Sequence, residues 1–242
     1  MRWDSGHVSV EDSVPTSTQL GGDVLRTSFL PSIQAVTFGL IRARDHSLVL
    51  GPLRLLRFGP PKVTRHAVSW PIEGGLLTAS AGGWLTVQSS ARELKATVED
   101  YRPMLPLGMY RATQLRLHHA LVRIQLLRLA EHEAPGVPAS LRSRAAAGAV
   151  DVALCAGLAL VARRRRLRVL ATVLAAYHVA CWTSSGRTLG GRLLGQRVVS
   201  LDGSGVSLMQ AALRFAALPL ALVHRRPVHD DIAATTVLQD PN

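Results

Sequence analysis

Residues 145–162 read AAAGAVDVALCAGLALVA, and this stretch decides the class of fold because its single charge is Asp151. Two further apolar stretches follow: VLATVLAAYHVACW at 169–182, which has no charge, and LMQAALRFAALPLALV at 208–223, which contains Arg214. Each is shorter than the roughly 20 apolar residues of an ideal membrane span. All three are apolar around the whole helix, and flanking arginines can extend a short span by snorkelling. We therefore predict an α-helical membrane domain of about three short transmembrane segments.

The charges inside these segments are candidates for function. An ionisable side chain near the centre of a span costs about 2.5–3.5 kcal/mol, so it needs a partner, a watery cavity or a shallow position. Arg144 precedes Asp151 by about two helical turns and projects from the same face. Such charges either bind or relay ions within the helical bundle, or form an interhelical ion pair that helps the segments assemble.

The part of the chain before the apolar segments predicts a small α+β domain over residues 29–134. Several short β-type runs are punctuated by Gly and Pro, namely IQAVTFGLI (33–41), LVLGPLRLLRF (48–58), RHAVSW (65–70), GGLLTA (74–79), GWLTVQ (83–88) and LKATVEDY (94–101). Residues 107–131 read as one long helix, with Leu117, Leu121 and Ile124 on one face. Short strands capped by one long helix suggest, by fold analogy, a domain of the helix-grip type.

Two segments outside these domains have compositions that predict irregular structure. Residues 1–28 are rich in Ser, Thr, Asp and Gly without a period, which predicts a disordered polar arm. Residues 135–141 belong to a Pro/Gly-containing stretch that predicts a linker before the membrane domain at 142–239.

The charge balance indicates an anionic partner. The formal net charge is +12, from 28 basic and 16 acidic residues. This charge suits nucleic acid or an anionic membrane surface, but no recognisable nucleic-acid-binding module or aromatic interleaving is present. We therefore expect the partners to be the lipid bilayer and its anionic headgroups, with no nucleic acid.

The sequence offers no catalytic or metal-binding pattern. Cys155 and Cys181 both fall in apolar runs, and no CxxC, Cys/His cluster or HExxH occurs. The glycines between 186 and 195 lack the Lys-Ser/Thr of a phosphate loop, and no nucleophile elbow places a serine. We expect no enzyme activity, no cofactor and no metal.

Four blocks of the C-terminal part together resemble the RDD family of membrane domains, over residues 142–239. The blocks are RAAAGAVD (144–151), GRTLGGRLLGQRVVSLDG (186–203), LRF (213–215) and VHDDIAATTVL (228–238). The short apolar segments and the arginine-rich RRRRLR (163–168) depart from the usual appearance of the family.

The resemblance implies particular functional residues. The family arginine falls on Arg144, the first family aspartate on Asp151, and the second on Asp230, with Asp231 incidental. With Arg214 they would form a polar cluster, and Asp230 would pair with Arg144 or Arg214. The supporting motif residues that the resemblance implies are Gly186, Thr188, Leu189, Gly190 and His229.

The resemblance also implies a multi-pass protein of the cell membrane with a cytoplasmic N-terminal domain. This layout would place Arg163–Arg166 outside, against the positive-inside rule, although Arg187, Arg192 and Arg197 would lie inside. Three short spans make a thin pathway, so a transporter of this kind would form homo-oligomers. The activity is then either ion or small-solute transport through the polar cluster, or non-enzymatic binding of a lipid, apolar ligand or protein by a membrane-anchored N-terminal domain.

Overall fold

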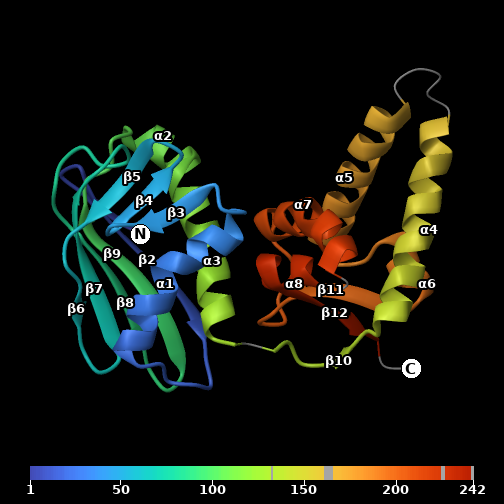
Figure 1. The fold of residues 1–242 in the computed structure, drawn as a ribbon, viewed down its shortest axis with the longest axis horizontal. Coiled ribbons are helices and arrows are strands. Elements are labelled where there is room, and N and C mark those ends of the chain that lie inside the picture. Colours follow the sequence, from blue (N-terminus) through green and yellow to red (C-terminus); the bar gives the residue numbers. More distant parts are fainter. Residues whose placement is uncertain (132, 161–165, 225–226, 241–242) are drawn as a thin grey trace. The chain divides into compact units, whose positions relative to one another are not determined.

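The chain forms two compact units in a computed structural model, Met1–His132 and Glu133–Asn242 (Figure 1). The structure describes residues 1–131, 133–160, 166–224 and 227–240. The N-terminal unit is built on a large antiparallel sheet, and the C-terminal unit is mainly helical with a short sheet.

The N-terminal unit is an antiparallel sheet with helices against one face (Figure 1). Its strands are β1 (Arg2–Asp4), β2 (His7–Pro15), β3 (Ile41–Arg44), β4 (Ser47–Leu50), β5 (Leu53–Phe58), β6 (Lys62–Val63), β7 (Ala67–Gly74), β8 (Trp84–Ser89) and β9 (Glu93–Tyr101). Its helices are α1 (Gly22–Val36), α2 (Leu107–Ala112) and α3 (Gln114–Leu129). The strand order is β1-β2-β9-β8-β7-β5-β4-β3, with β6 paired to β7. The last long strand, β9, therefore lies beside the first long one, β2, and α3 follows β9 in the chain.

The predicted disordered arm at 1–28 is wrong, because these residues form β1, β2 and the start of α1. In β2 the side chains of Val8, Val10 and Val14 are buried, whereas most of the residues between them are polar. This alternation is that of a strand with one face on the core. The unit therefore begins before residue 29.

The run at 33–41, expected to be a strand, is instead the end of α1 and the turn after it, and only its last residue, Ile41, belongs to a strand, β3. Leu25, Phe29, Ile33 and Val36 are buried at helical spacing. Pro31 lies inside the helix on its exposed side, where the lost backbone hydrogen bond faces solvent. Because proline usually interrupts regular structure, Pro31 indicates a break before a strand in the sequence, although it lies inside a helix.

The single long helix expected over 107–131 is divided at Thr113. The backbone of Thr113 is not helical, with φ −121° and ψ −78°, and its hydroxyl donates to the Met109 carbonyl at 2.7 Å. A threonine hydroxyl that bonds to the preceding turn competes with helix continuation. The break sets the orientation of Gln114, the first residue of α3.

The C-terminal unit joins apolar helices to a short antiparallel sheet. Its helices are α4 (Leu141–Leu160), α5 (Arg166–Ser185), α6 (Leu189–Leu193), α7 (Leu208–His224) and α8 (Val228–Ala233). Its strands are β10 (Val137–Pro138), β11 (Gln196–Ser200) and β12 (Thr235–Gln239), in the order β10-β12-β11. The predicted linker at 135–141 thus contributes β10 to this sheet. Residues 163–165 of the arginine-rich stretch lie outside the described residues.

Two helices of the described residues are long and apolar enough to cross a membrane, and they correspond to the first two predicted segments. They are the spans Leu141–Leu160 and Leu167–Ser185, of whose apolar windows only 22% and 11% are buried in the protein. The core helix of a soluble protein would be mostly buried, so these helices are better suited to lipid. The third predicted segment forms the shorter apolar helix Leu208–Ala221, and three spans are not confirmed.

The connection from α5 to α7 contains a short helix and a strand that pairs with a later part of the chain. Its helix α6 is five residues long, and β11 pairs with β12, which comes after α7. A tight turn at Asp202-Gly203 follows β11, with the Gly203 amide donating to the Ser200 carbonyl at 2.8 Å. The chain then enters α7 instead of returning as a second hairpin strand.

Candidate functional site

Asp230 of α8 lies between two arginines. One carboxylate oxygen, Oδ2, accepts a hydrogen bond from Nη1 of Arg144 at 2.7 Å. The other, Oδ1, is in close contact with Nη1 of Arg214, which also donates to the Thr235 hydroxyl at 2.9 Å. Asp230 and Arg214 are both buried. The structure therefore brings together three of the four residues of the predicted cluster.

Both arginines have further contacts that fix them in place. Arg144 donates from Nε to the Ala139 carbonyl at 2.9 Å and from Nη2 to the Val237 carbonyl at 3.2 Å. The Arg214 guanidinium lies over the Trp182 ring, 4.9 Å from its centroid. The cluster thus connects α4, α5, α7, α8 and β12, as expected of an ion-pair network that holds these elements together.

Asp151 belongs to a second, separate group of contacts. Its Oδ1 accepts from the Tyr177 hydroxyl and from the Gly190 amide, both at 2.8 Å. Nε2 of His178 lies 3.8 Å from Oδ2. Seven helical residues separate Asp151 from Arg144, a rise of about 10.5 Å along α4, so the two side chains share a face but find different partners.

The glycines of the predicted motif allow close backbone approach. A Cβ on Gly190 would lie 2.1 Å from the Ala147 carbonyl oxygen, so only glycine lets α6 pack this tightly against α4. Gly186 has φ +70°, in the left-handed region that favours glycine. Its carbonyl accepts from the Val198 amide at 2.7 Å, which ties the end of α5 to β11.

Thr188 and Leu189 position the short helix α6. The Thr188 hydroxyl accepts from the Gly191 amide at 3.0 Å and so forms the N-cap. The Leu189 amide donates to the Tyr177 hydroxyl at 2.6 Å. Tyr177 is therefore a member of the site that the sequence did not identify, and a phenol inside an apolar segment is the signal that could have found it.

His229 and Asp231 flank Asp230 but have different environments. Nε2 of His229 lies 3.5 Å from Oδ1 of Asp230. Burial, and secondarily the charges of Arg214 and Arg144, lower the pKa of His229 to about 3, so the imidazole is neutral at pH 7. Asp231 is exposed.

Comparison with known proteins agrees with this organisation. Residues 166–233 match the model of the RDD family. This part of the chain matches the RDD family, and the membrane region around it is called the RDD domain below. The matched residues include Arg214, Asp230 and the motif from Gly186 to Gly190, and they begin after Arg144 and Asp151. No curated protein and no solved structure matches the chain. With its two apolar candidate spans, the RDD domain indicates a membrane protein of unassigned function.

The N-terminal unit contains an apolar cavity of about 340 Å³ between the sheet and helices α1 and α3. Its lining is almost wholly aliphatic and aromatic, with polar groups from Gln114, His118 and Gln125. Two lining residues, Leu50 and Leu117, are 38% and 46% exposed, so the apolar lining continues to the surface. The volume falls at the lower end of the range for small-molecule sites, about 300–1,000 Å³.

Asp12 of β2 anchors α3 beside this cavity. Its Oδ1 lies 2.6 Å from Nδ1 of His119, and its Oδ2 lies 3.5 Å from Nε2 of His118. Burial raises the pKa of the Asp12 carboxyl, but the contacts with the two histidines outweigh burial and lower the pKa overall. His119 and His118 of α3 thus both contact a carboxylate of β2.

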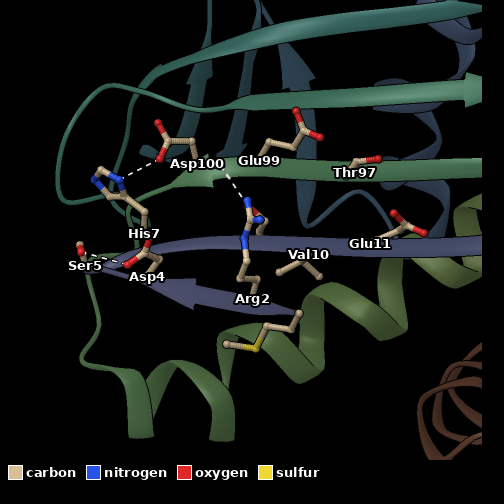
Figure 2. Close-up of a pocket in the computed structure, with 11 residues that line it drawn as sticks. Arg2, Asp4, Ser5, His7, Val10, Glu11, Thr97, Glu99 and Asp100 are labelled. Atoms are coloured by element: carbon tan, nitrogen blue, oxygen red, sulfur yellow. Dashed lines mark hydrogen bonds and ion pairs between the residues drawn. The ribbon is translucent and has the colours of Figure 1, made fainter.

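A second, open pocket of about 750 Å³ lies at the β1, β2 and β9 end of the sheet (Figure 2). Figure 2 shows Asp4, His7 and Asp100 gathered at one end, with Glu11 and Glu99 along the strands. His7 contacts Asp100 at 2.8 Å, and both side chains are largely exposed. Exposed pairs of this kind contribute little, so we assign no ligand to this pocket.

Proposed function

We propose that this protein is a membrane-anchored, non-enzymatic binding protein whose N-terminal unit holds an apolar ligand. The 340 Å³ cavity is the observation that carries the proposal. Protein interiors are close-packed, and voids larger than a water molecule are few. A cavity of this size, with lining that reaches the surface at Leu50 and Leu117, is better explained by an occupant than by imperfect packing.

The RDD domain would anchor the protein in the bilayer. Large side chains of α4 and α5, including Val152, Leu158 and Leu167, are exposed, which suits contact with lipid chains. Arg168, near the start of α5, and Arg192, in α6 after the end of α5, are both exposed, and their guanidinium groups would meet anionic headgroups. In this proposal the N-terminal unit is cytoplasmic.

Photolabelling of the full chain in lipid nanodiscs tests the binding role. A ten-carbon chain bearing a diazirine should crosslink to residues that line the cavity, as mapped by mass spectrometry. Val122→Trp would fill the cavity and should abolish that labelling, whereas Val24→Trp, at an exposed position of α1, should leave it unchanged. Labelling confined to α4 and α5 would contradict the proposal, because it would report only on the bilayer.

Ion transport is a second candidate, and Asp151 is the residue that favours it. The Asp230 carboxylate contacts Arg144 through one oxygen and Arg214 through the other, which leaves it little capacity for a moving ion. Asp151 is buried in α4 and contacts neutral donors, Tyr177 and the Gly190 amide, and an intramembrane carboxylate of this kind is typical of proton relays.

Flux measurements test the transport role. Asp151→Asn should abolish proton or cation flux in proteoliposomes, whereas Asp231→Asn, at an exposed position, should not. Unchanged flux in the Asp151→Asn protein, or no flux in the wild type, would rule out this candidate.

A further inference from the structure

Gln114, which lines the apolar cavity, has an unsatisfied acceptor. Its side-chain oxygen Oε1 is buried and has no hydrogen-bond partner among the described residues. A buried polar atom without a partner loses its hydration without replacement, at a considerable cost in stability. Such an atom in the lining of a cavity indicates that a ligand supplies the missing donor.

The orientation of the Gln114 amide follows from its neighbours. Nε2 donates to the Tyr101 hydroxyl at 2.8 Å and lies 3.4 Å from the Leu77 carbonyl oxygen. The Tyr101 hydroxyl itself donates to that carbonyl. Because a carbonyl can only accept, the nitrogen of the amide must face Leu77, and Oε1 is the free atom.

The tyrosine cannot become the missing donor. Burial raises the pKa of Tyr101 well above its ordinary value, so its hydroxyl keeps its proton. That proton is committed to the Leu77 carbonyl, and the oxygen accepts from Gln114 Nε2. The Tyr101–Leu77–Gln114 arrangement therefore holds Oε1 as a fixed, neutral acceptor in the lining.

We propose that the ligand of the cavity is a neutral aliphatic alcohol, or a longer lipid that ends in a hydroxyl, whose hydroxyl group donates to Oε1 of Gln114. This proposal rests on the proposed binding function and names its ligand class. At about 30 Å³ for each atom of water size, the cavity accommodates on the order of ten non-hydrogen atoms. A carboxylate headgroup would place an acceptor oxygen against Oε1, which is itself an acceptor. The negative charge of Asp12, which contacts the lining residue His118, would add repulsion.

Two isomeric competitors test this assignment. 1-Decanol and methyl nonyl ether have the same atoms, but only the alcohol has a hydroxyl donor. In competition with the ten-carbon diazirine probe on the full chain in nanodiscs, decanol should reduce cavity labelling at about tenfold lower free concentration than the ether, as expected for one hydrogen bond to a buried acceptor. Decanoate should compete less well than decanol.

The Gln114→Met variant removes the acceptor and keeps the side-chain volume, so the tenfold preference should fall to near one while the ether still competes. Equal competition by the two isomers in the wild type would overturn the alcohol assignment and leave apolar binding intact. Stronger competition by decanoate, or a preference that survives in Gln114→Met, would overturn it as well. Failure of both isomers and of the probe to reach the cavity would instead refute the binding function itself. The wild-type ratio decides the question even if the variant does not fold.

Discussion

The Asp230 carboxylate accepts a 2.7 Å hydrogen bond from Arg144, a residue 86 positions earlier in the chain. This contact joins the beginning of α4 to α8, and Arg214 of α7 contacts the other carboxylate oxygen. One carboxylate thus contacts two guanidinium groups, of which Arg214 is buried and Arg144 is half-buried. Its removal should be far more damaging than the loss of one ordinary ion pair.

We predict that Asp230→Asn strongly destabilises the RDD domain. The amide keeps the shape of the side chain but leaves the buried Arg214 and the half-buried Arg144 without this counter-charge, and removal of one partner from a buried pair costs on the order of 3–5 kcal/mol. Thermal unfolding in detergent should show a large drop in Tm. Asp231→Asn changes the exposed neighbour and should keep the wild-type Tm. A wild-type Tm for both variants would contradict the role of Asp230 in holding the helices of this domain together.

Gly190→Ala should disrupt the contact between α6 and α4. The added Cβ would lie 2.1 Å from the Ala147 carbonyl oxygen, so α6 must move and the hydrogen bond from the Gly190 amide to Asp151 must lengthen. Gly148→Ala is the matched control, because a Cβ there meets nothing within 4 Å. Alanine is favoured over glycine inside a helix by about 0.5–1 kcal/mol, so the control should be as stable as the wild type or more so. Equal stability of the two variants in chemical unfolding would refute the requirement for glycine at position 190, where α6 contacts α4.

The sequence predicts the C-terminal unit better than the N-terminal one for a physical reason. Helices α4 and α5 are apolar all round, a pattern typical of a membrane span or of a fully buried helix, and both predict a helix. The pairing of Asp230 was expected with one of two arginines, and the structure has both. By contrast, the partners of Asp151 are a phenol from an apolar run and a backbone amide, which no charge pattern reveals.

The predictions for the N-terminal unit are wrong where local composition and tertiary burial favour different structures. Strand β2 keeps Val8, Val10 and Val14 inward, but its polar outward residues resemble the disordered composition around them. Pro31 interrupts α1 in sequence without breaking it in structure. In both cases tertiary burial decides the conformation, and local composition alone cannot report it.

The Asp12 site predicts a pH dependence for the N-terminal unit. The pKa of Asp12 is lowered in the folded protein, so its contacts stabilise the fold above the unfolded value of about 3.9. This contribution is lost as the pH falls through the folded-state pKa. Asp12→Asn should therefore be less stable than the wild type near neutral pH, and the difference should shrink at acid pH. Glu93→Gln changes an exposed position. Its difference from the wild type in free energy of unfolding, measured by urea unfolding, should stay the same between pH 3 and pH 7.

The last prediction concerns α7, which we expect to enter the membrane without crossing it. Strand β11 precedes α7 and β12 follows it, yet the two strands pair directly. Gln210, near the start of α7, also donates to the Ala234 carbonyl at 3.0 Å, just before β12. Because both flanks of α7 meet in one sheet, they must lie on the same side of the bilayer, as in a re-entrant segment.

Cysteine labelling separates this topology from three full spans. In a Cys155→Ala/Cys181→Ala background, a membrane-impermeant maleimide should reach Arg192→Cys and Asp231→Cys from the same side, and Arg168→Cys from the opposite side. Arg92→Cys in the N-terminal unit should label with Arg192→Cys, because α4 and α5 together cross twice. Labelling of Asp231→Cys from the side of Arg168→Cys would mean that α7 crosses, and the pairing of β11 with β12 could not then exist in the membrane. Labelling of all four positions from one side would show instead that neither α4 nor α5 spans.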